Sequence, residues 1–346
     1  MTNANRIMYP QVLVLGNGVL RAYGGGAENS CSDLEKLICQ ALGAESPFDD
    51  ESQIVPFTMR IAASLAGSEK SSNPIERAVN LLVQERIKGD AVTNELLCNS
   101  GIKDALCFKK LLEAGFTDVI TTNYGYEVEE VLCGKHPTCD DMRRDFYRSC
   151  SGPKNTLLKG IRERKFKIWR HYLSRNGATR IWHVHGEYLK PQSIIFEYAD
   201  YCSLLSKIKN YPRPQCNEST EESLEEGNGT PKNWVQAFLK GDVYILGFSA
   251  ALGELAFWRM MEKRKRKDFE NGMVHFYEPK FEYREEKNLL KNHQQKAVLT
   301  MLKAFGAKRH DLDVKISESN EGDFKSFYQK AIEDIIQKVQ GCKIIA

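Results

Sequence analysis

Four short apolar runs, each ending at glycine or small polar residues, constrain the fold of this chain more than any other feature of its sequence. The runs are VLVL at residues 12–15, VITT at 119–122, IWHV at 181–184 and VYIL at 243–246. Such runs, rich in β-branched residues, are typical of parallel strands that are buried on both faces. Helical patterns separate them along the chain. We therefore predict an α/β protein with a Rossmann-like, mostly parallel sheet and helices on both faces.

Weaker patterns complete this outline. Further strands are predicted at residues 193–196, 273–277 and 313–316. The mixed, basic stretch 134–175 is predicted to be helical, and a stripe of apolar residues at helical spacing predicts a last helix over 324–339.

Two segments of the chain do not follow this alternation of strands and helices. Residues from about 45 to 115 have helical character without a convincing strand and are predicted to form a helical insertion. Residues from about 210 to 232 combine prolines with a glutamate cluster and few apolar residues, which predicts a mobile surface loop. Because the α/β pattern resumes afterwards, we treat residues 1–346 as a single domain.

The first strand is followed by Gly16, Asn17 and Gly18, which read as a tight turn. A glycine-rich loop at residues 24–29 comes next. The capping box at residues 32–35 would then begin the first helix.

Composition excludes several classes of protein. With 42% hydrophobic and 27% charged residues, the chain resembles a globular domain and not a disordered, collagen-like or coiled-coil protein. No apolar run approaches the roughly 18 residues of a membrane helix, and residues 1–10 lack a secretory apolar core, so we expect a cytoplasmic protein without a membrane partner. A net charge of +3 does not indicate a nucleic-acid partner. The basic run 263–267 favours a solvated helix end, because no aromatic residues alternate with it.

The ten cysteines do not form a metal-site pattern. None of them forms a C-x-x-C pair, and the group Cys133, His136 and Cys139 has no second half. We expect reduced thiols and neither zinc nor another metal.

Four of the predicted strands end in turns that could hold a ligand. Ligands of open parallel sheets bind outside the carboxyl ends of the strands, and helix amino termini there attract anions. Together the turns predict a phosphate-bearing ligand, such as a dinucleotide. Each turn also has a plainer interpretation, since the glycine turn lacks the third glycine of the dinucleotide fingerprint, Asn123 could cap a helix, and His185 could be a core histidine. Gly247 and Ser249 could form an ordinary strand–helix turn.

In order and spacing, these motifs resemble those of sirtuin-like domains over residues 10–280. They are closer to the branch that hydrolyses NAD in prokaryotic anti-phage defence than to protein deacetylases. The motifs are LGNG at residues 15–18, ITTNY at 120–124, HVHG at 183–186, DY at 200–201 and ILGFS at 245–249. The paired-cysteine zinc ribbon and the longer first signature of deacetylases are both missing. Gly125 stands where the family often has an aspartate, so the resemblance implies no ribose contact by an acid at this position.

The resemblance implies an NAD hydrolase (NADase) that cleaves the nicotinamide–ribose bond and depletes cellular NAD. NAD would be its substrate, and no cofactor is implied. Asn123 would hold the attacking water or the ribose, and His185 would act as the base, with a pKa near working pH. The residues implied to contact NAD are Gly16, Asn17, Gly18, Thr122, Tyr124, Gly186, Gly247, Phe248 and Ser249.

His183 competes with His185 for the role of base. On a strand, residues two apart face the same side, so alternation alone does not separate them. We choose His185 because it lies at the strand end beside Gly186 and occupies the His-Gly position of the family.

Uncontrolled loss of NAD would kill a host cell. We therefore expect control by homo-oligomer assembly or by a separate regulatory protein encoded alongside, such as an ATPase or a nucleotide-processing enzyme. Two alternatives remain open: a non-catalytic sensor of NAD or ADP-ribose, and an ADP-ribosyltransferase. A hydride-transfer enzyme fits poorly, because it needs a fuller glycine fingerprint and a ribose-binding acid, and the local capping role already accounts for Glu35.

Overall fold

The computed structural model describes only part of the chain, and all structural statements below concern that part. The described residues are 9–24, 39, 55, 59–61, 63, 105–133, 157–159, 170–174, 177–186, 195, 198–209, 231, 233–266, 271–281, 289–310, 312, 315–316 and 321–344. Most of the predicted helical insertion and loop, all of the capping box, and the predicted strand at 193–196 apart from Ile195 lie outside these residues.

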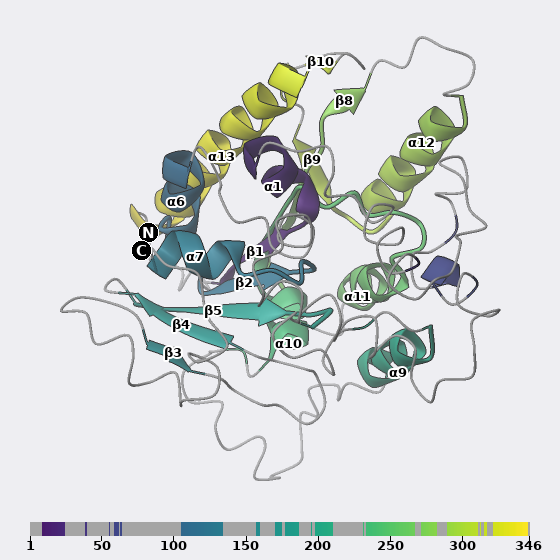
Figure 1. The fold of residues 1–346 in the computed structure, drawn as a ribbon, viewed down its shortest axis with the longest axis horizontal. Coiled ribbons are helices and arrows are strands. Elements are labelled where there is room, and N and C mark those ends of the chain that lie inside the picture. The colour runs from purple at the N-terminus through teal and green to yellow at the C-terminus, as the bar shows by residue number, and fades with distance from the viewer. Residues whose placement is uncertain are drawn as a thin grey trace, which may run out of the picture.

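The centre of the fold is an eight-stranded sheet with the spatial order β3-β4-β5-β2-β1-β6-β7-β9 (Figure 1). All neighbours from β5 to β9 run parallel, whereas β4 is antiparallel to both of its neighbours. The predicted mostly parallel sheet is therefore confirmed. In chain order the strands are β1 (Gln11–Leu15), β2 (Asp118–Thr121), β3 (Leu157–Lys159), β4 (Arg170–Ser174), β5 (Gly177–His183), β6 (Asp242–Leu246), β7 (Val274–Tyr277) and β9 (Lys308–His310).

The order of the parallel strands locates the place where a ligand is expected. Counted along the chain, the six parallel strands lie side by side in the order third, second, first, fourth, fifth, sixth. This is the order of doubly wound sheets that bind dinucleotides, and such sheets bind ligands where the order reverses. Here that reversal lies between β1 and β6, which pair along their whole length.

Helices cover both faces of the sheet, as predicted. Alternate residues of each strand point to opposite faces, so Val12 and Val14 lie in one apolar core and Leu13 and Leu15 in the other. The first core is closed by α9 (Tyr198–Lys209), α10 (Trp234–Lys240), α11 (Leu255–Lys265) and α12 (Leu289–Ala304). The second is closed by α1 (Asn17–Gly24), α6 (Ala105–Leu112), α7 (Glu127–Cys133) and α13 (Glu321–Ile344).

Two local predictions are wrong. The stretch 134–175, predicted to be helical, contains β3 and β4, because β4 pairs with β5 and β3 with β4, and this pairing supplies hydrogen-bond partners that a sequence window does not reveal. The tight turn predicted at Gly16–Gly18 is not formed, since α1 begins directly at Asn17, and the loop predicted at 24–29 lies outside the described residues apart from Gly24. The strand predicted at 313–316 exists as β10 (Lys315–Ile316), but it pairs with β8 (Lys280–Phe281) in a separate small sheet.

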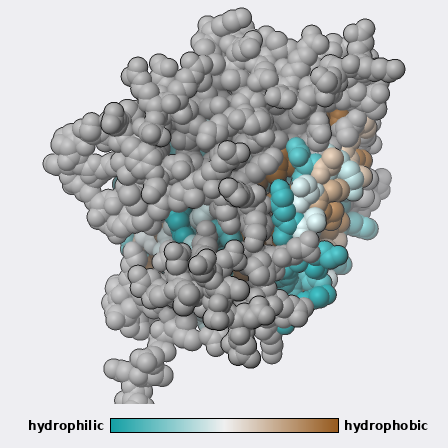
Figure 2. All heavy atoms as spheres, turned by 90° about the horizontal axis from the view of Figure 1, so that it is seen from below, coloured by the Kyte–Doolittle hydropathy of each residue, from teal (hydrophilic) through white to brown (hydrophobic). Residues whose placement is uncertain are grey.

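The described surface has a mixed character. Figure 2 shows hydrophilic and hydrophobic residues side by side on the described part of the face seen from below. Among the described helices, none has the length and apolarity that crossing a membrane requires.

A pair of histidines lies at the β7–β9 side of the sheet. Nδ1 of His275 is 2.8 Å from Nε2 of His310, and the two rings stack on Tyr244 and Tyr277 respectively. Burial lowers the pKa of both histidines to about 4, so both rings are neutral at pH 7.

This pair makes stability depend on pH. Between about pH 6.5 and pH 4 the unfolded chain binds more protons than the folded chain at these two sites, so the free energy of unfolding is expected to fall as the pH is lowered through this window. The variant His275→Phe keeps a ring on Tyr244 and removes one titrating group, so it should lose less stability over the same window. Urea denaturation across the window measures this. An unchanged pH dependence in His275→Phe would show that the histidine pair does not contribute.

Candidate functional site

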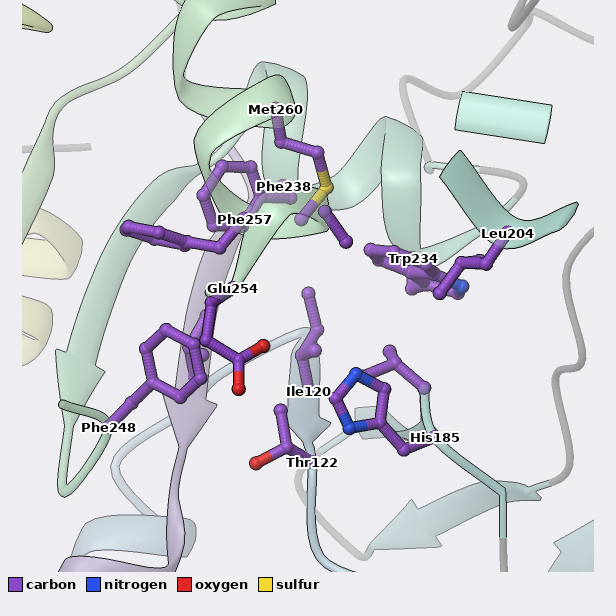
Figure 3. A pocket seen from close by; sticks show the side chains of 13 residues that line it. Ile120, Thr122, His185, Leu204, Trp234, Phe238, Phe248, Glu254, Phe257 and Met260 are labelled. Atoms are coloured by element: carbon purple, nitrogen blue, oxygen red, sulfur yellow. The ribbon is translucent and has the colours of Figure 1, made fainter. Parts of the chain in front are cut away.

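A cavity of about 30 Å³ lies at the carboxyl ends of β1, β2, β5 and β6, on the face covered by α9, α10 and α11 (Figure 3). It lies beside the strand-order reversal, where the topology predicts a ligand. Its described lining residues are Val14, Ile120, Thr122, Val184, His185, Leu204, Trp234, Phe238, Phe248, Glu254, Ala256, Phe257 and Met260.

Two of these lining residues bring titratable groups into a largely apolar and aromatic space. Figure 3 shows the imidazole of His185 and the carboxylate of Glu254 facing the same space, with Thr122 beside them and its hydroxyl turned away from the imidazole. His185 comes from the end of β5 and Glu254 from the start of α11. The fold therefore joins groups that are far apart in the sequence.

His185 enters the cavity because β5 stops just before it. The strand ends at His183, and a turn follows in which Gly186 has a φ of +93°, a conformation that glycine adopts without strain. The backbone carbonyl of His185 accepts a hydrogen bond from the N–H of Ile195 at 2.9 Å. The imidazole keeps only part of its surface exposed, and burial lowers its pKa to about 4. The ring is therefore neutral at pH 7, and its pKa is not near the working pH as we expected from the sequence.

His183 does not share this position. Its Nδ1 donates to the backbone carbonyl of Asn123 at 3.1 Å, and its Nε2 lies 2.8 Å from Oε1 of Glu129 in a pair with no exposed side-chain surface. The expectation that both histidines face the same side is wrong, because the turn after His183 breaks the alternation. His183 lies on the α7 side, and His185 lines the cavity on the other.

Glu254 is a residue that the sequence reasoning missed. It precedes α11 as the N-cap residue, but its side chain makes no capping hydrogen bond. The hydroxyl of Tyr201 instead accepts the backbone N–H of Ala256 at 3.0 Å. Glu254 is thereby left to point into the cavity, where burial raises its pKa to about 7. The only sequence signal is a lone acid before an apolar helix, which is too common to single out.

Tyr201 belongs to the same neighbourhood, whereas the adjacent Asp200 is exposed. The Tyr201 ring lies edge-on to His185, with ring centroids 6.3 Å apart. Burial, and then the nearby Glu254 carboxylate, raise the pKa of Tyr201 well above its ordinary value, so its hydroxyl stays protonated.

Asn123 lies at the end of β2, next to the end of β5, because Thr121 and His183 are in register. Its backbone N–H donates to Oγ1 of Thr121 at 3.1 Å, and its side-chain Nδ2 is buried without a hydrogen-bond partner. Asn123 is not among the described residues that line the cavity, although its neighbour Thr122 is. A buried amide donor without a partner is rare and indicates a ligand atom or a water as its complement.

The glycines at the ends of β1 and β6 pack against each other. The N–H of Gly18 donates to the carbonyl of Gly247 at 2.8 Å, and a Cβ at Gly16 would lie 2.3 Å from the same oxygen. Gly247 has a φ of +70°, and a Cβ there would lie 2.5 Å from the nitrogen of Val19. These glycines therefore allow close backbone contact at the switch point, and the amide of Gly18 is already used within the protein.

The other residues implied by the resemblance are placed differently from one another. Phe248 lines the cavity, whereas Ser249 beside it is exposed. Asn17, Tyr124 and Gly186 are not among the described lining residues.

At Gly125, where the family often has an aspartate, the side chain of Glu127 occupies the space that a side chain would need. A Cβ at Gly125 would lie 2.2 Å from Oε1 of Glu127. Glu127 is only 4% exposed, so a buried carboxylate lies where the resemblance leads one to expect an aspartate.

The described residues contain no group of three or more histidine, cysteine or acidic side chains that could hold a metal ion. The group Cys133, His136 and Cys139 lies outside the described side chains.

No known family model matches the chain, and a search among curated proteins likewise finds no relative of it.

Proposed function

We propose that this protein hydrolyses NAD at the bond between nicotinamide and ribose. The observation that carries the proposal is the cavity at the carboxyl edge of a sheet with the strand order of dinucleotide-binding folds, lined by a neutral histidine and a buried glutamate. Titratable groups with shifted pKa values that line a cavity beside the switch point are candidates for catalytic groups.

Cleavage of the bond between nicotinamide and ribose requires little general-acid catalysis from the protein. The departing nicotinamide is already a cationic ring, and its loss leaves an oxocarbenium-like ribose, as in glycoside hydrolysis. The site must hold the ribose and keep bulk water away, and the apolar and aromatic lining favours the second of these tasks. The neutral imidazole of His185 would accept a hydrogen bond from a ribose hydroxyl or a water. The buried amide of Asn123 would donate to a ribose oxygen.

The pyrophosphate would lie at the glycine contact between β1 and β6. There α1 begins at Asn17, and the amino terminus of a helix favours a negative charge. The contacts that the resemblance assigns to Gly16, Asn17, Gly18, Gly247 and Ser249 belong to this part of the proposal.

The cellular role is part of the same proposal. The protein would deplete NAD in the cytoplasm during anti-phage defence, as a homo-oligomer or under a separate regulatory protein such as an ATPase or a nucleotide-processing enzyme. The resemblance supports this role.

Nicotinamide release from NAD by the purified full chain tests the proposal. Nicotinamide and ADP-ribose should appear in equal amounts, alone or after addition of a candidate partner. Tight NAD binding without turnover under any condition would instead support the sensor. Transfer of labelled ADP-ribose to protein would support the transferase.

A further inference from the structure

The cavity has the size and the polar groups of a water site. A buried water needs about 10–15 Å³ of accessible space and two to four polar partners. The cavity of about 30 Å³ therefore has room for about two waters, and His185 and Glu254 offer two polar partners. A nicotinamide ring is much larger, so in this conformation the cavity suits the second reactant of a hydrolysis better than the first.

Glu254 is the acid–base group best prepared to act on such a water. Its carboxylate makes no capping hydrogen bond and points into the cavity (Figure 3). By contrast, Glu262 on the same helix pairs with Arg259 and Arg266.

Among the groups that surround the Glu254 carboxylate, none is a stronger base at pH 7 than Glu254 itself. His185 faces it from the end of β5 and Tyr201 from α9, whereas α10 contributes the apolar side chains of Trp234 and Phe238. Val14 of β1, Ile120 of β2 and Thr122, which follows β2, line the cavity from the side of the sheet. A general base works best when its pKa is close to the working pH. Burial brings the pKa of Glu254 to about 7 and that of His185 to about 4, so Glu254 is much the stronger base of the two.

We infer that Glu254 is the general base of the proposed hydrolysis, and that it takes a proton from a water held between Glu254 and His185. This inference rests on the proposed function and moves the role of base from His185 to Glu254. The bond between C1′ of the ribose and N1 of nicotinamide breaks, and its electron pair neutralises the pyridinium nitrogen. The water oxygen bonds to C1′, and one water proton passes to the Glu254 carboxylate, which later releases it to solvent. The products are nicotinamide, ADP-ribose and one proton.

The variant Glu254→Gln separates water activation from bond cleavage. Exchange of labelled nicotinamide into NAD needs the bond to break and reform, but it needs no water. We expect Glu254→Gln to lower hydrolysis by about 10²-fold or more, the typical contribution of a general base, while label exchange continues. Wild-type hydrolysis should rise with pH up to about 7, where the carboxylate loses its proton, and level off above it. That rise should be absent in the variant.

Two further variants control the experiment. Glu262→Gln, on the same helix but in a surface ion pair, should leave hydrolysis and exchange unchanged. Glu254→Asp keeps a carboxylate and should restore part of the hydrolysis together with its pH dependence. Thermal melting of each variant shows whether it is folded.

Two results would overturn the assignment of Glu254: wild-type hydrolysis rates in Glu254→Gln, or equal loss of hydrolysis and exchange in the folded variant. A wild-type protein that neither hydrolyses NAD nor exchanges label under any condition would overturn the proposed function, and the assignment with it.

Discussion

Replacing His185 with alanine is expected to lower nicotinamide release from NAD by about 10²–10³-fold, the usual loss when one preorganised hydrogen-bonding group is removed from a reaction centre. The imidazole is neutral because burial lowers its pKa to about 4, so it can accept a hydrogen bond at pH 7 without adding positive charge beside an oxocarbenium-like ribose. Steady-state release of nicotinamide, measured by chromatography, gives the size of the loss. His185→Asn, which keeps a polar group of smaller size, should lose less.

The matched control is His293→Ala. This histidine is exposed on α12, outside the described lining of the cavity, so its removal should leave the rate unchanged. A folded His185→Ala protein that releases nicotinamide at the wild-type rate would remove His185 from the site. In His185→Ala, exchange of labelled nicotinamide into NAD should fall as much as hydrolysis, because His185 contacts the ribose as well as the water. In Glu254→Gln, by contrast, exchange should continue while hydrolysis falls.

Replacing Asp118 with alanine is expected to lower the free energy of unfolding by about 3–5 kcal/mol, as is usual when one partner of a buried ion pair is removed. Asp118 has no exposed surface, and one of its oxygens lies 2.7 Å from Nη2 of Arg180. It also accepts hydrogen bonds from the indole of Trp182 and the hydroxyl of Thr117, both at 2.8 Å. The variant leaves the Arg180 guanidinium buried without its carboxylate.

Urea denaturation of a matched pair of variants tests the reason for the loss. Glu113→Ala breaks the exposed pair with Lys109 and should cost no more than about 1 kcal/mol. The double variant Asp118→Ala with Arg180→Met removes both charges and should recover part of the stability. If the double variant is as unstable as Asp118→Ala, the loss comes from packing and not from an unpaired charge. Because Asp118 lies at the amino-terminal end of β2, opposite the cavity, folded Asp118→Ala should keep its activity.

Five of the six parallel strands, β1, β2, β5, β6 and β7, were predictable because each is a local apolar run typical of a buried strand, whereas β9, a short polar strand, was missed. Strands β3 and β4 were not predicted either, since they lie in a mixed, basic stretch and their conformation depends on pairing, β4 with β5 and β3 with β4. The start of α1 at Asn17 was also missed. Gly16 and Gly18 favour a turn when only the local sequence is considered. In the structure they lie where β1 passes into α1, and their lack of side chains allows close contact with Gly247.

The sequence by itself determined the class of fold and brought His185 and Thr122 forward as site residues, because strand ends are marked by local signals. Only the tertiary structure decided that His183 faces the core, that His185 faces a cavity, and that Glu254 lies there with them. It also decided their charge states, because a pKa depends on how deeply a group is buried. That burial comes from α9, α10 and α11, helices whose packing no local pattern in the sequence specifies.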